Sequence, residues 1–141
     1  TIYFDPRLDI AVIRVPELET APLSIGNTTS LRGTIGAVLG YPGGGDLTVS
    51  PAAVLGVARA VGRDIYGSGL VTRQIYELQA EVQPGSSGGP LVAPNGTVLG
   101  MIFAKSTANE GIAYALTAPE ITKALQLAGS YTVDTGSCLE K

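Results

Sequence analysis

Glycine and proline interrupt this sequence so often that most of its apolar runs are too short for helices. The 141 residues include nineteen glycines and nine prolines, while 45% of the residues are hydrophobic. Helices average about eleven residues, whereas about five are enough for a strand. Short apolar runs bounded by turn residues therefore predict an all-β protein, and a chain of this length can bury one core.

The clearest strand covers residues 76–82, where apolar and polar side chains alternate. Such alternation is typical of a strand with one face in the core and one in water. Asn95-Gly96 separates two apolar runs and is the preferred dipeptide of a tight hairpin turn. The same criteria predict further strands at residues 2–4, 10–15, 35–39, 47–61, 90–92, 97–104 and 112–116.

Three other segments depart from the strand pattern. Residues 16–32 contain two prolines and a Ser/Thr cluster without periodicity, which indicates a linker. We expect breaks at Pro51 and Gly56 and an exposed loop at residues 63–73. Residues 117–120 have the spacing of a capping box, and the apolar residues that follow lie on one helical face, which predicts a helix ending near Gly129.

Charge and composition argue against several classes of protein. The net charge is −3 and the nine lysines and arginines form no basic stripe, so we expect no nucleic acid partner. No apolar run approaches the roughly 20 residues that span a bilayer, so any export signal or anchor would have to lie upstream of residue 1. The chain has no histidine and one cysteine, Cys138, so we expect no metal and no other cofactor. A lone cysteine is an inert thiol or, in an exported protein, pairs with another segment.

The most informative segment is Gln-Pro-Gly-Ser-Ser-Gly-Gly-Pro-Leu at residues 83–91, between two predicted strands. A nucleophilic serine needs an exposed hydroxyl on a tight turn, with backbone N–H groups directed at the oxyanion formed during attack. Glycines on both sides give a substrate access and permit the required backbone angles. The five residues Gly-Ser-Ser-Gly-Gly, taken alone, are more typical of a flexible loop.

With its flanking strands and hairpin, this segment resembles the nucleophile segment of the trypsin-like serine proteases. The resemblance implies that Ser87 is the nucleophile and that the amides of Gly85 and Ser87 form the oxyanion hole. Ser86 stands where the family usually has Asp or Asn, and it cannot form the ion pair with a freed N-terminus that activates digestive members. The bacterial HtrA-like branch is therefore the closer comparison.

A second match covers residues 8–15, Leu-Asp-Ile-Ala-Val-Ile-Arg-Val, which resemble the family's strand that begins at the catalytic aspartate. The resemblance implies that Asp9 orients the histidine and stabilises its imidazolium form. An aspartate before a strand is ordinarily a turn or cap residue. The order and spacing relative to Ser87 favour Asp9 over Asp5.

The resemblance also implies a fold and a set of boundaries. Residues 1–15 correspond to the last hairpin of the first barrel of a chymotrypsin-like double-barrel fold, and residues 16–33 to the linker between the barrels. Residues 34–129 correspond to a complete second six-stranded β-barrel with a C-terminal α-helix, and residues 130–141 to a tail.

Substrate-binding positions are implied in the same way. Phe103, Ala104 and Lys105 are expected beside the cleft, at the end of a strand that pairs with the substrate. Glu81 lies six residues before Ser87, where the family has the floor of its specificity pocket. An acid there favours a basic substrate side chain, whereas the alternation of the strand puts Glu81 on its solvent face.

Four softer motifs, at residues 4–6, 40–44, 64–67 and 71–73, resemble a narrower group. These are actinobacterial periplasmic proteases of the MarP type, which act in acid resistance and carry a CvpA-like membrane region before the protease domain. The likeness implies an extracytoplasmic, membrane-anchored protein of the bacterial stress response. It also implies a disulfide between Cys138 and a cysteine outside this chain.

A serine nucleophile needs a base, and this sequence has no histidine. In the family the histidine precedes the aspartate, so truncation or autoproteolysis upstream of residue 1 is expected, and the fragment alone is expected to be inactive. Its expected partners are a protein or peptide substrate and the segment bearing the histidine.

A Ser-Lys dyad with Lys105 or Lys123 is disfavoured because a lysine that acts as a general base needs burial. Two alternatives stay open: a non-catalytic peptide-binding scaffold, and a structural β-domain with a Gly-Ser loop.

Overall fold

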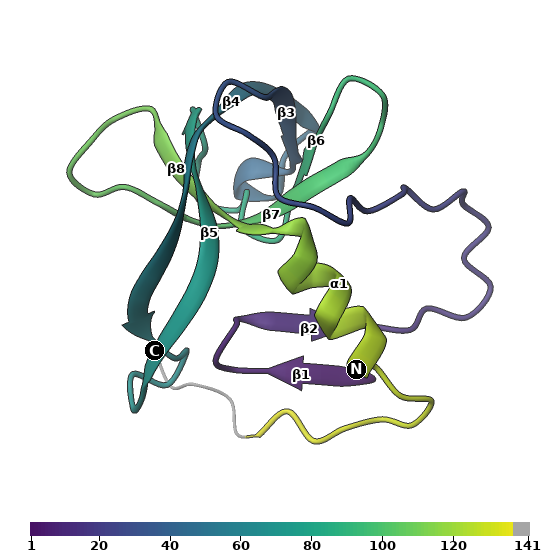
Figure 1. The fold of residues 1–141 in the computed structure, drawn as a ribbon. Coiled ribbons are helices and arrows are strands. Elements are labelled where there is room, and N and C mark those ends of the chain that lie inside the picture. Colours follow the sequence, from purple (N-terminus) through teal and green to yellow (C-terminus); the bar gives the residue numbers. More distant parts are fainter. Residues whose placement is uncertain (137–141) are drawn as a thin grey trace.

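The computed structural model describes residues 1–136, which form a closed β-barrel, a two-stranded hairpin and one α-helix (Figure 1). The barrel strands follow the order β3-β4-β5-β8-β7-β6, and every neighbouring pair is antiparallel. The expected all-β fold with a six-stranded barrel, a hairpin and a C-terminal helix is confirmed. In chain order the elements are β1 (Tyr3–Asp5), β2 (Ile10–Val12), β3 (Ile35–Gly40), a 3-10 turn (Pro42–Gly44), β4 (Thr48–Arg63), β5 (Leu70–Ala80), β6 (Pro90–Val92), β7 (Val98–Lys105), β8 (Ile112–Thr117) and α1 (Ala118–Leu127).

The barrel core consists of inward side chains that are almost completely excluded from solvent. Tyr76 and Leu78 of β5, Leu91 of β6 and Ile102 of β7 expose 1% of their surface or less. The alternation predicted for this part of β5 is confirmed, because Tyr76, Leu78 and Ala80 are buried while the residues between them are exposed. The strand ends at Ala80, two residues earlier than predicted.

β4 is a single strand of sixteen residues, so the predicted breaks at Pro51 and Gly56 are wrong. β4 pairs with β5 only from Ala52 onward, and Pro51 therefore interrupts no ladder on that side. The register shifts between Val54 and Gly56, where the glycine follows a β-bulge. The predicted loop is also shorter than expected, because β4 continues to residue 63 and β5 begins at residue 70.

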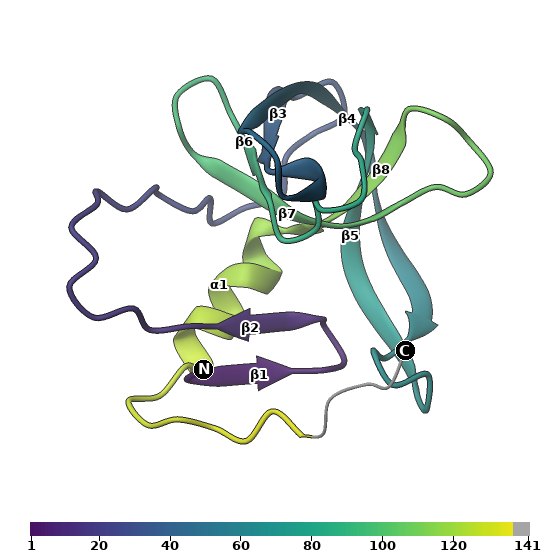
Figure 2. The ribbon, with the colours of Figure 1, turned by 180° about the vertical axis from the view of Figure 1, so that it is seen from behind.

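The far ends of β4 and β5 form an arm that extends beyond the barrel. β3 pairs with β4 only as far as Ala53, and β8 pairs with β5 only from Ile75, so the two strands continue as a ribbon of their own. We call residues 57–63 and 70–74 the β4–β5 arm. Both views show it running down beside the β1–β2 hairpin (Figures 1 and 2).

A second hydrophobic cluster joins the hairpin to the barrel, the arm and the helix. Ile10 of β2, Ile75 of β5, Leu116 of β8 and Ala124 of α1 are all buried within it. Helix α1 lies between the barrel and the hairpin in Figures 1 and 2. Apolar contacts therefore hold the hairpin in a defined place beneath the barrel.

Helix α1 forms where the apolar spacing predicted it, but its start differs from a capping box. Thr117 occupies the N-cap without a side-chain capping bond, and its hydroxyl instead donates to Oε1 of Gln74 at 3.3 Å. Thr117 is fully buried at the end of β8, so its hydroxyl needs a partner inside the protein. Leu125, expected on the buried face, is 44% exposed. Within residues 1–136 no helix is long and apolar enough to cross a membrane.

Replacement of Leu78 by Ala should lower the free energy of unfolding by about 2–5 kcal/mol, because a fully buried leucine leaves a cavity. The matched control is Leu70→Ala on the same strand, where the side chain is 70% exposed and the change should stay within about 0.5 kcal/mol. Denaturant unfolding measures both. Equal losses for the two variants would contradict the assignment of the core.

Candidate active site

The serine segment forms two tight turns between β5 and β6 that are anchored to the barrel. The amide of Ser86 donates to the carbonyl of Gln83 and the amide of Gly89 to the carbonyl of Ser86, each at 3.0 Å. The amide of Gly88 donates to the carbonyl of Ile102 on β7 at 2.7 Å, and the amide of Ile102 returns a bond to Gly89 at 2.9 Å. The loop is therefore an ordered part of the barrel rather than a flexible connection.

Ser87 stands at the apex of this loop with its side chain exposed. Gly85 and Gly88 on either side have φ values of +96° and +83°, in the region that residues other than glycine rarely adopt. Within residues 1–136, neither the amide of Gly85 nor that of Ser87 donates a hydrogen bond. The loop thus presents a hydroxyl together with two unengaged N–H donors, and an oxyanion site needs donors of this kind.

The turn at residues 41–45 packs directly against the serine loop. The amide of Gly43 donates to the carbonyl of Pro84 at 3.1 Å. A Cβ atom on Gly85 would lie 2.7 Å from the nitrogen of Gly43, and one on Gly89 would overlap the carbonyl oxygen of Leu39. Close backbone packing therefore requires glycine at residues 85 and 89. Local sequence patterns could not predict this requirement, because the packed segments are about forty residues apart in the chain.

Ser86 points into the protein rather than toward a substrate. Its exposed fraction is 6%, and its hydroxyl oxygen accepts a hydrogen bond from the amide of Gln83 at 3.4 Å. A Cβ atom on Gly40 would lie 3.4 Å from the Cα of Ser86. The position thus holds a small polar side chain that is satisfied within its own loop.

Ser87 lies between two pockets. One, of about 190 Å³, has the apolar side chains of Val82, Ile102 and Ala104 in its wall and Lys105 at one side. The other, of about 340 Å³, includes side chains of β3 and of the following turn, among them Leu39, Tyr41 and Leu47. A hydroxyl with a pocket on each side is suited to an extended chain that passes across it.

Two of the three residues expected beside the cleft lie next to Ser87, and one does not. Ala104 and Lys105 line the pocket of about 190 Å³ together with Ser87. Phe103 occupies a β-bulge between β7 and β8 and packs against the cluster that contains Ile10. Its side chain lines neither of the two pockets beside Ser87.

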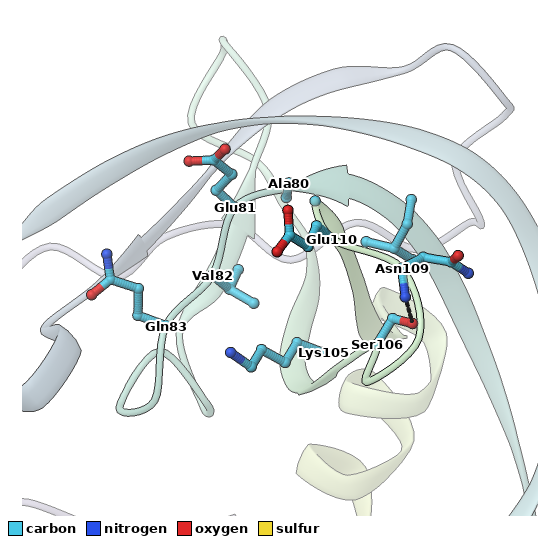
Figure 3. Close-up of a pocket in the computed structure, with 10 residues that line it drawn as sticks. Ala80, Glu81, Val82, Gln83, Lys105, Ser106, Asn109 and Glu110 are labelled. Atoms are coloured by element: carbon cyan, nitrogen blue, oxygen red, sulfur yellow. Dashed lines mark hydrogen bonds between the residues drawn. The ribbon is translucent and has the colours of Figure 1, made fainter.

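Glu81 lines a neighbouring pocket of about 270 Å³, to which Glu110 and Lys105 also belong (Figure 3). It is exposed, as the alternation of its strand predicted, and it is not part of the wall that Ser87 shares. Figure 3 shows Val82 between the side chains of Glu81 and Lys105. This pocket adjoins the pocket of about 190 Å³, because Val82, Gln83 and Lys105 line both of them.

Asp9 closes the turn between β1 and β2. The carboxylate of Asp5 accepts hydrogen bonds from the amides of Arg7 at 2.8 Å and Leu8 at 3.3 Å. Asp9 follows with φ at +60°, which is uncommon outside glycine, and its side chain is exposed. The next residue, Ile10, is 4% exposed. The turn thus holds Asp9 at the surface while it buries its neighbour.

Asp9 and Ser87 belong to different parts of the fold, the hairpin and the barrel. Within residues 1–136 no side-chain hydrogen bond joins them, and Asp9 lines neither pocket beside Ser87. Ser87, Gly85, Ala104 and Lys105 are brought together at one site. Cys138, expected in a disulfide, lies outside the described residues.

Comparisons with known proteins agree with this arrangement. The family model described as "Trypsin-like peptidase domain" matches residues 1–101. Serine protease Rv3671c of Mycobacterium tuberculosis is 39% identical over 140 residues, which is 98% of this chain and 35% of that protein. A probable periplasmic serine endoprotease DegP-like of Bartonella henselae is 37% identical over 86% of this chain and 24% of its own length. The chain therefore spans less than two thirds of these relatives.

Solved structures of serine proteases also superimpose on this chain. The active form of the Rv3671c protease from M. tuberculosis superimposes with a TM-score of 0.93 at 39% identity, over 99% of this chain and 62% of that one. Its inactive form gives a TM-score of 0.79 over 90% of this chain and 65% of that one. An HtrA-type protease, AlgW with a decapeptide, gives 0.70 at 25% identity, over 89% of this chain and 39% of that one.

The serine loop with its two unengaged amides, the six-stranded barrel and these matches agree on one assignment. This chain belongs to the family of trypsin-like peptidase domains and is homologous to the serine protease Rv3671c.

Proposed function

We propose that this chain supplies the nucleophile, the oxyanion site and the orienting aspartate of a serine endopeptidase. The observation that carries the proposal is the exposed hydroxyl of Ser87 on a rigid loop with the unengaged amides of Gly85 and Ser87. Preorganised N–H donors at the place where negative charge develops are often the largest single contribution to such catalysis.

The proposed reaction has two steps. The oxygen of Ser87 attacks the carbonyl carbon of a peptide bond while a base removes the hydroxyl proton, and the resulting oxyanion accepts hydrogen bonds from the amides of Gly85 and Ser87. The C–N bond then breaks, the leaving amine takes the proton from the base, and an acyl ester remains on Ser87. Water, deprotonated by the same base, hydrolyses the ester and regenerates the serine.

The base we propose is a histidine on a segment outside this sequence, oriented by Asp9. Serine is a poor nucleophile near neutral pH without such a base, and none of the 141 residues is histidine. Lys105 and Lys123 are both exposed, whereas a lysine that acts as a general base requires burial. The exposed position of Asp9 beside a buried strand residue supports its role at a surface that another segment covers.

The proposed substrate is a polypeptide with an apolar side chain before the bond that is cleaved. The pocket next to Ser87 is walled by Val82, Ile102 and Ala104, and the ammonium group of Lys105 at its side disfavours a cationic guest. Glu81 stands in the adjoining pocket, where it would contact only a side chain long enough to pass Val82. Phe103 supports the binding strand through the core rather than through the pocket.

We further propose an extracytoplasmic location in the bacterial periplasm, with a membrane anchor upstream of residue 1 and a role in acid resistance. The relatives include a probable periplasmic endoprotease, and the four softer motifs of the sequence support the narrower comparison. A disulfide between Cys138 and a cysteine outside this chain belongs to the same proposal. A second candidate, a non-catalytic peptide-binding domain, is favoured by the absence of histidine from the sequence.

The decisive experiment uses the full-length protein and the 141-residue chain side by side. The full-length protein should cleave peptide substrates and react with a serine-directed phosphonate, and Ser87→Ala should abolish both. The isolated chain should show neither, since it lacks a base. Hydrolysis that survives Ser87→Ala would refute the nucleophile, and an inactive full-length protein would favour the binding domain.

Replacement of Gly85 by Ala should lower kcat/KM at least about 100-fold, the effect expected when an oxyanion donor is displaced. The matched control is Gly96→Ala in the β6–β7 turn. Both glycines have positive φ, but a Cβ atom on Gly96 meets nothing within 4 Å, whereas one on Gly85 meets the backbone of Gly43. Comparable losses in kcat/KM for the two variants would show that backbone strain alone explains the effect.

A further inference from the structure

A single carboxylate organises the connection between β4 and β5. Oδ1 of Asp64 accepts hydrogen bonds from the amides of Tyr66 at 3.1 Å and Ser68 at 2.9 Å. Its Oδ2 accepts from the hydroxyl of Ser68 at 2.9 Å, and the amide of Asp64 donates to the carbonyl of Gly69 at 2.9 Å. Residues 64–69 are thereby folded into one compact turn around the carboxylate.

The donors around Asp64 favour its ionised form. The backbone hydrogen bond from Ser68 is the main cause that lowers the pKa of Asp64, and the amides of Tyr66 and Gly69 act in the same direction. Asp64 is only partly buried, so its main contribution is the geometry that it imposes on the turn rather than a buried charge.

This compact turn contacts the turn that carries Asp9. The amide of Ile65 donates to the carbonyl of Pro6 at 3.1 Å, and Pro6 lies between Asp5 and Asp9 in the β1–β2 turn. The contact joins residues that are 59 positions apart in the sequence. Figures 1 and 2 both show the tip of the β4–β5 arm beside the end of the hairpin from which β2 starts.

Besides the Ile65–Pro6 bond, Ala60 of the arm packs against the cluster around Ile10, and the hydroxyl of Tyr66 donates to the carbonyl of Thr135 at 3.3 Å. Beyond Ala53 no partner strand covers the outer edge of β4, and before Ile75 none covers that of β5. The hydrogen bond from Ile65 to Pro6 can fix the position of the tip only if the amide of Ile65 is held in one orientation. The bonds that Oδ1 of Asp64 accepts from the amides of Tyr66 and Ser68 in the same turn supply that orientation.

We propose that Asp64 is a positioning residue that sets the place of Asp9 through the Ile65–Pro6 hydrogen bond. This inference rests on the proposed function, because it assigns the barrel arm a role in aligning the aspartate of the hairpin. Asp5 caps the same turn from within, and Asp64 fixes it from the barrel. The hairpin and the barrel thereby keep a defined relation at the site.

The test is Asp64→Ala in the full-length protein. We expect kcat to fall about tenfold with KM unchanged, because small displacements of catalytic groups cost up to about 100-fold. The acid limb of the kcat/KM profile should move to lower pH, because a histidine that loses its carboxylate partner holds its proton less firmly. A residue that served only to stabilise the fold would change the amount of active enzyme and would not move this limb.

Two further variants make the test specific. Asp64→Asn keeps a carbonyl oxygen for the amides of Tyr66 and Ser68, so it should restore most of kcat and the position of the acid limb. Asn95→Ala removes a similar side-chain cap, the bond from the amide of Thr97 at 3.1 Å, in a turn between β6 and β7. It should leave kcat and the acid limb unchanged.

Hydrogen exchange gives a readout that does not require activity. In the full-length protein, Asp64→Ala should speed exchange of the Ile65 amide at least tenfold relative to Asn95→Ala. The inference is overturned if this amide exchanges at the wild-type rate, or if an active protein carrying Asp64→Ala keeps its kcat and acid limb. A full-length wild type without peptidase activity would overturn the proposed function itself, and the inference with it.

Discussion

Close backbone packing at the serine loop is the constraint on which the candidate site depends. Gly89 lies against the carbonyl of Leu39, Gly85 lies against the amide of Gly43, and Gly88 bonds to Ile102. These contacts leave no room for side chains at residues 85 and 89, and they involve three separate parts of the barrel. A loop held in this way would need no reorganisation if negative charge developed at the proposed oxyanion site.

The second constraint is the placement of the hairpin relative to the barrel. It is met by apolar packing around Ile10 and Ile75 and by the hydrogen bond from Ile65 to Pro6. The hydrogen bond depends on the length of the β4–β5 arm, which carries strand geometry well past the edge of the barrel, and Ala60 of the arm packs against the same apolar cluster.

Local patterns predicted the elements whose environment is simple. The alternation at residues 76–80, the hairpin at Asn95-Gly96 and the amphipathic spacing of α1 all gave the right type of structure, but the hairpin loop spans residues 93–97 and of the pair only Gly96 has a positive φ. The predictions were wrong where tertiary contacts override local preference. Pro51 pairs with Ala37 of β3 but has no partner on the β5 side, and Gly56 is absorbed by a bulge, so neither ends the strand. Thr117 makes a buried bond to Gln74 instead of capping the helix.

By itself the sequence determined the identity of the candidate groups: a serine among glycines, an aspartate before an apolar strand, and no histidine in 141 residues. Only the tertiary structure decided how those groups are presented. It left the amides of Gly85 and Ser87 unengaged, turned Ser86 inward, and separated Glu81 from the wall that Ser87 shares. The reason is that side-chain chemistry is local, whereas the space and hydrogen-bond partners of a loop are set by segments far away in the chain, here the turn at residues 41–45 and β7.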